Sequence, residues 1–168
     1  YGKGNKMSKS LGNTVDPIKL VNQFGADIVR LWATSVAYQQ DVRISNDIMK
    51  QISENYRKIR NTMRFVLGNL NDFKENDLVA IKDLAPVDRY MLAELNDLID
   101  GYNNAYENFD FAEANQLILN YFTNLLSSFY MDFTKDILYI EKADSLRRRQ
   151  VQTVLYYHAK IMMKLISP

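Results

Sequence analysis

The sequence predicts an all-α fold, an antiparallel bundle of four long helices preceded by two short helices and a basic loop. Apolar residues recur every three or four positions along most of the chain, and no segment alternates apolar and polar residues over a useful length. Residues that favour helix starts stand at the beginning of these apolar patterns. With 168 residues, of which 47% are hydrophobic and 24% charged, the chain can bury a sizeable core.

Two short helices are expected first. Asp16 is a good N-cap, Pro17 suits the first helical position, and Gly25 suits the residue after a helix, which predicts a helix over about 17–24. A second short helix should cover about 26–36, where Ile28 and Trp32 lie at helical spacing. Residues 38–44 are expected to connect these helices to the bundle.

The four long helices follow in order. Ser45 can cap a helix whose apolar stripe runs to about residue 70, and residues 72–85 have no period and should form a linker. Pro86 starts the second helix, and Asp110 with Glu113 forms a capping box for a third that reaches about residue 131. After a connector at 136–142, Asp144 or Ser145 can cap the last helix. Most aromatic residues at helical spacing should be core, and the His of the last helix, at position 158, should be half-buried.

Composition excludes several classes of site and partner. The chain has no cysteine and a single histidine, so we expect no disulfide and no bound metal. No apolar run approaches the ~20 residues that span a bilayer, so we expect no membrane partner. The ordinary composition favours a cytoplasmic protein, and we expect a monomer. Because the net charge is only +1, any RNA contact must come from local clusters of Lys and Arg. The start at Tyr1 and the end at Pro168 suggest a piece of a longer protein.

The first residues form a candidate phosphate-binding loop. Lys6-Met7-Ser8-Lys9-Ser10 places two ammonium groups three positions apart, with two hydroxyls and neighbouring glycines. Such a loop can surround a polyphosphate and stabilise charge that develops when phosphate is released, although a short Lys/Ser stretch taken alone is more often a solvated loop.

The surrounding residues favour the phosphate-binding interpretation. The run Gly4–Asn13, then Asp16-Pro17, Gly25-Ala26-Asp27 and Arg30-Leu31-Trp32, resembles the KMSKS region of class I aminoacyl-tRNA synthetases in content and spacing. Further segments are similar to the isoleucyl-tRNA synthetase family: Tyr38–Ser45, Tyr56–Thr62, Ala105–Phe111, Leu126–Asp132 and Lys135-Asp136. The resemblance covers nearly the whole chain.

The resemblance implies a function and a division of the chain. Lys6 and Lys9 would be catalytic and would bind ATP together with Met7, Ser8 and Ser10, with Mg present in the intact enzyme. Residues 1–15 would be a remnant of the catalytic domain, 16–44 a hinge that contacts the tRNA stem, and 45–168 the anticodon-binding domain for isoleucine tRNA. The missing catalytic and editing domains of the same chain would be its other partners. The His-Ile-Gly-His signature of the class is missing, so we expect this piece alone to be inactive.

Two arginine clusters are candidate tRNA contacts. Arg57, Arg60 and Arg64 lie on one face of the first long helix, which allows phosphate contacts or a merely solvated face. Arg147 and Arg148 lie in the first turn of the last helix, where cations oppose the helix dipole and need an RNA phosphate or a carboxylate such as Glu141. Alternatives are another class I synthetase, such as the valyl enzyme, and a helical protein-interaction module without an RNA role.

Overall fold

Helices make up the architecture of the computed structural model, which describes residues 6–39 and 41–167. Two short helices, α1 (Pro17–Phe24) and α2 (Ala26–Thr34), precede α3 (Asn46–Gly68), α4 (Pro86–Glu107), α5 (Phe111–Asn120), α6 (Asp132–Ile140) and α7 (Leu146–Leu165). A π-helical segment, Tyr121–Met131, joins α5 to α6 without a break, so α5 and α6 act as one long helix. The predicted all-α fold is confirmed, since no strand occurs in the described ranges.

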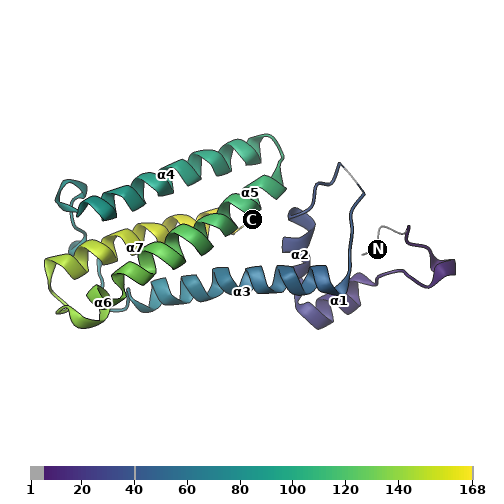
Figure 1. Cartoon of the computed structure of the whole chain (residues 1–168), viewed down its shortest axis with the longest axis horizontal. Coiled ribbons are helices and arrows are strands. Elements are labelled where there is room, and N and C mark those ends of the chain that lie inside the picture. Colours follow the sequence, from purple (N-terminus) through teal and green to yellow (C-terminus); the bar gives the residue numbers. More distant parts are fainter. Residues whose placement is uncertain (1–5, 40, 168) are drawn as a thin grey trace.

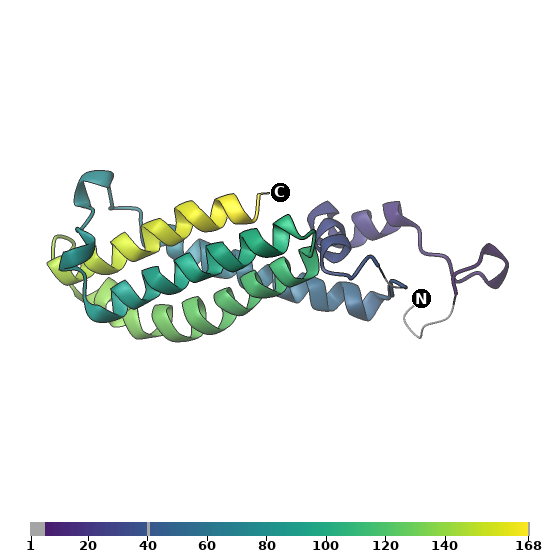
Figure 2. The same ribbon diagram turned by 90° about the horizontal axis from the view of Figure 1, so that it is seen from above.

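The long helices lie side by side as a bundle, with α7 in contact with α3, α4 and α6 (Figure 1). The short helices α1 and α2 pack at one end of α3, and the loop of residues 6–13, called the lysine loop below, extends beyond them (Figure 2). None of the helices in the part of the chain that the structure describes is long and apolar enough to cross a membrane.

Side-chain caps begin four of the helices where the sequence predicts them. The Asp16 carboxylate accepts the Ile18 N–H at 2.9 Å at the start of α1. The Ser45, Asp110 and Ser145 side chains accept N–H groups at the starts of α3, α5 and α7, at 3.2, 3.0 and 3.2 Å. Each such cap satisfies a backbone donor that has no partner inside the helix and is worth about 1 kcal/mol.

Two predicted connectors contain more structure than expected. The connector predicted at 136–142 is wrong over residues 136–140, because α6 continues to Ile140 and buries Leu138 in the core. Polar residues such as Asp136 lie on the exposed face of this last part of α6, and they interrupt the apolar pattern from which a helix would be predicted. The linker at 72–85 contains two 3₁₀ turns, Glu75–Asp77 and Ile81–Asp83, and the Val79 N–H donates to Thr153 Oγ1 at 3.0 Å.

The apolar side chains form two clusters. The larger fills the bundle and includes the fully buried Phe122 and Tyr130, and the smaller joins α1, α2 and the start of α3 around Leu20, Ile28 and Met49. Among the aromatic residues that the periodicity places in the core, Tyr90, Tyr106 and Phe129 are instead exposed.

His158 is fully buried, not half-buried as expected, and it is held by two hydrogen bonds. A carbonyl can only accept, so Nδ1 donates its proton to the Val154 oxygen at 2.7 Å. The neutral ring then accepts the Tyr121 hydroxyl at Nε2, also at 2.7 Å. Burial lowers the pKa of His158 to about 4. This histidine therefore belongs to the core and is neutral near pH 7.

Candidate nucleotide and nucleic-acid contacts

The lysine loop, residues 6–13, is a small closed turn with exposed cations. Residues Lys9–Leu11 form one 3₁₀ turn, and Gly12 follows it in the left-handed conformation with φ 62°. Lys6 and Lys9 are exposed, and the Ser8 and Ser10 hydroxyls lie 2.6 Å apart. The two predicted catalytic lysines are thus on one short loop, where both ammonium groups can reach an anionic ligand.

Asn13 closes this loop, a role that the sequence pattern did not predict. Its Oδ1 accepts the Ser8 N–H at 2.8 Å, and its Nδ2 donates to the Lys6 carbonyl at 3.1 Å. The signal in the sequence was the Gly12-Asn13 pair, which is typical of tight turns. The pattern alone could not show which backbone groups the amide binds.

The predicted basic face of α3 is present and exposed. Arg57, Arg60 and Arg64 all lie at the surface of α3. Arg57 pairs with Glu54 at 2.6 Å, but both side chains are about two-thirds exposed, at 66% and 60%, so the pair is weak and readily exchanged for a phosphate. Within residues 6–39 and 41–167, Arg60 and Arg64 form no ion pair.

A shallow pocket lies at the end of this face. It has a volume of about 420 Å³ and is lined by Asn61, Arg64, Phe65, Gly68, Asn69 and Tyr139. The Phe65 and Tyr139 rings meet edge to face with their centroids 6.4 Å apart, and Tyr139 is largely exposed. Arg64 therefore stands beside an aromatic pair formed by Phe65 of α3 and Tyr139 of α6.

The second arginine cluster is tied to carboxylates of the same chain. Arg147 forms an ion pair with Asp88, which is fully buried in the first turn of α4 and also accepts the Tyr130 hydroxyl at 2.8 Å. Arg148 pairs with Asp72 and donates from Nε to the Leu138 carbonyl at 3.2 Å.

These contacts identify the carboxylates that offset the helix dipole at the start of α7. They are Asp88 and Asp72, and Glu141, which the sequence suggested, takes no part in an ion pair among the described residues. The hydrogen bond from Arg148 holds the pKa of Asp72 below its usual value. The structure thus gives Arg147 and Arg148 an internal role, and their contact with tRNA stays a prediction.

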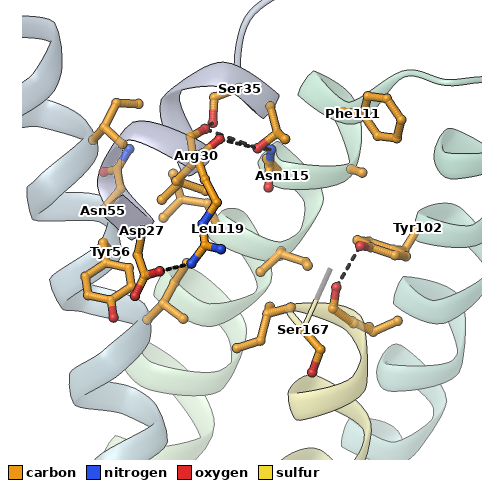
Figure 3. A pocket seen from close by; sticks show the side chains of 18 of the residues that line it. Asp27, Arg30, Ser35, Asn55, Tyr56, Tyr102, Phe111, Asn115, Leu119 and Ser167 are labelled. Carbon is orange, nitrogen blue, oxygen red and sulfur yellow. Dashed lines mark hydrogen bonds and ion pairs between the residues drawn. The ribbon is translucent and has the colours of Figure 1, made fainter. Parts of the chain in front are cut away.

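A second pocket lies where α2 meets the bundle, and it contains none of the predicted site residues. Its volume is about 430 Å³, and side chains from α2, α3 and α5 and from the ends of α4 and α7 line it (Figure 3). Asn115 Nδ2 donates to Thr34 Oγ1 at 2.9 Å across the α2–α5 contact, and the Tyr102 hydroxyl donates to the Leu165 carbonyl at 2.6 Å. The first of these contacts joins α2 to the bundle beside this pocket, and the second links α4 to the end of α7.

Comparison with known proteins agrees with this geometry. A family model described as the anticodon-binding domain of tRNA ligase matches residues 88–168, and a model of class I tRNA synthetases (I, L, M and V) matches residues 1–45. The isoleucine–tRNA ligases of Bacillus mycoides (strain KBAB4) and Bacillus cereus (strain B4264) are each 58% identical over 168 residues, which covers 99% of this chain and 18% of theirs. The chain thus spans less than a fifth of the length of these curated relatives.

A solved structure shares the fold. It is the LeuRS of Agrobacterium radiobacter K84 (agnB2) in a ternary complex with tRNA and LeuAMS, with a TM-score of 0.66 and 20% sequence identity. The match covers 98% of this chain and 21% of that chain. From the two family models and the relatives, the chain belongs to the isoleucine–tRNA ligases of the class I tRNA synthetases.

Proposed function

We propose that this chain is the tRNA-contacting part of an isoleucine–tRNA ligase and carries one of the two motifs that activate isoleucine. The observation that carries the proposal is the 58% identity with isoleucine–tRNA ligases over almost the whole chain, including the lysine loop. In the intact enzyme, isoleucine and ATP would give isoleucyl-adenylate and pyrophosphate, and the isoleucyl group would then pass to the 3′ end of its tRNA. We place this reaction in the cytoplasm and expect the enzyme to be a monomer.

The proposed role of the lysine loop is to hold the triphosphate of ATP. As pyrophosphate leaves, negative charge builds up on its oxygens, and the Lys6 and Lys9 ammonium groups would stabilise that charge. The Ser8 and Ser10 hydroxyls and the loop amides add hydrogen-bond donors. Magnesium would accompany ATP in the intact enzyme.

The proposed role of α3 is to bind the phosphate backbone of isoleucine tRNA. Arg57, Arg60 and Arg64 form an exposed basic face on a chain whose net charge is only +1, so attraction of RNA to α3 would come from this local cluster. The structural relative from Agrobacterium radiobacter was solved with tRNA, which supports a tRNA partner for this fold. Arg147 and Arg148 would act mainly by holding the bundle together.

Lys9→Ala in the full-length ligase tests the activation role. We expect the rate of isoleucine-dependent pyrophosphate exchange to fall by about 100-fold or more, because one preorganised donor to the transition state is worth roughly 3 to 4 kcal/mol. The affinity for isoleucine should stay the same. An exchange rate equal to that of the parent enzyme would contradict the role of this lysine.

A further inference from the structure

We propose that Asn13 is a positioning residue that sets the distance between Lys6 and Lys9. The inference rests on the proposed function, in which these two lysines hold the triphosphate. Asn13 lies outside the Lys-Met-Ser-Lys-Ser stretch and would not itself touch ATP. It would act by holding the backbone from which both lysine side chains project.

The side-chain amide of Asn13 makes two hydrogen bonds to one short stretch of backbone. Oδ1 accepts the Ser8 N–H at 2.8 Å, and Nδ2 donates to the Lys6 carbonyl at 3.1 Å. These two groups lie on either side of Met7, so the amide pairs with them as a peptide group of a neighbouring strand would. The partners also fix the orientation of the amide, because an N–H needs an acceptor and a carbonyl needs a donor.

Few other contacts hold the loop closed. The Leu11 N–H donates to the Ser8 carbonyl and the Gly12 N–H to the Lys9 carbonyl, both at 3.2 Å, and these bonds form only the 3₁₀ turn. Gly12, with φ 62°, then reverses the chain and brings Asn13 back to the start of the loop. Within the described residues, no hydrogen bond connects residues 6–13 to the helices.

The position of both lysines therefore depends on the loop backbone. Lys6 and Lys9 are exposed, so packing does not fix their side chains. A loop closed by Asn13 presents the two ammonium groups at one spacing before ATP binds. Without the amide, the loop samples more conformations. The variant must then order the loop in the transition state, and this raises its activation free energy above that of the parent enzyme.

The first experiment compares Asn13→Ala and Asn13→Asp in the full-length ligase. Alanine removes both hydrogen bonds, and aspartate keeps the shape and the acceptor but cannot donate to the Lys6 carbonyl. We expect kcat of pyrophosphate exchange to fall by about thirtyfold in each variant, equivalent to about 2 kcal/mol at 1.36 kcal/mol per tenfold change. The KM for isoleucine and the melting temperature should not change, which separates positioning from a general loss of structure.

The second experiment is a double-mutant cycle with Lys9→Ala. If Asn13 acts by setting the spacing of Lys6 and Lys9, that spacing no longer matters once Lys9 is alanine, so Asn13→Ala should slow the Lys9→Ala enzyme much less than it slows the parent enzyme. Asn103→Ala is the matched control, because Asn103 is exposed on α4, far from the loop in sequence. Multiplying effects in the double variant, or an Asn13→Ala rate equal to that of the control, would overturn the positioning role. An unchanged rate for Lys9→Ala would instead overturn the proposed function of the loop, and the positioning role with it.

Discussion

Replacing Arg147 by methionine should destabilise the bundle by about 3 kcal/mol, because it leaves a buried carboxylate without its cation. Asp88 is fully buried, and its charge is met by Arg147 and by the Tyr130 hydroxyl at 2.8 Å. Breaking a buried ion pair costs about 3–5 kcal/mol. The Arg147 side chain is 28% exposed, so water can reach the vacated position, and the lower end of that range applies.

Urea unfolding followed by circular dichroism at pH 7 measures this cost. Asp88→Asn keeps an acceptor for the Tyr130 hydroxyl but removes the charge, so the double variant Arg147→Met/Asp88→Asn should recover most of the lost stability. Arg60→Met is the matched control, because Arg60 is exposed on α3 and its loss should change stability by no more than about 0.5 kcal/mol. Equal stability of Arg147→Met and the control, or no recovery in the double variant, would refute the reasoning.

Three further predictions concern the core, the pH response and the basic face. Phe122→Ala should cost about 3–5 kcal/mol in urea unfolding, because Phe122 is fully buried and the space it leaves cannot collapse completely. The pKa of His158 is about 4 in the folded state and 6.5 in the unfolded state, so its contribution is present above pH 6.5 and is lost as the pH falls toward 4. That loss is roughly 3 kcal/mol at 1.36 kcal/mol per pKa unit. Urea unfolding at a series of pH values should show it in the parent protein but not in His158→Gln, and an equal slope of unfolding free energy against pH in both proteins would contradict it. The affinity for isoleucine tRNA should fall with rising salt, and Arg60→Gln and Arg64→Gln should each make the slope of log affinity against log salt less negative by roughly 0.7 to 0.9. An unchanged slope would exclude that arginine from the interface.

The helix pattern of this chain could be predicted from the sequence because its starts are encoded locally. A cap needs one side chain and an N–H two or three residues away, so Asp16, Ser45, Asp110 and Ser145 mark the starts of their helices. The end of α6 could not be found in this way. Its last turn is stabilised by Leu138, which is buried against other helices, and that contact is not local.

The same difference between local and distant contacts decides which parts of the candidate site could be predicted. The exposed face of α3 and the lysine loop follow from residues close in sequence, so they could be predicted. The ion pair between Arg147 and Asp88 joins residues 59 positions apart, and the contact of Arg148 with Asp72 spans 76 positions. Only the packed bundle brings these charges together, and the sequence therefore suggested Glu141, which is nearby in the chain.

Binding of this chain to isoleucine tRNA and to the same tRNA with a substituted anticodon, at about 50 mM and about 200 mM salt, tests the tRNA-contacting role most directly. We predict tighter binding of the unaltered tRNA, with affinity that falls as salt rises. The variant with Arg57, Arg60 and Arg64 all changed to Gln should lose most of that salt dependence. Equal, salt-insensitive binding of both tRNAs would contradict the proposed role of the bundle.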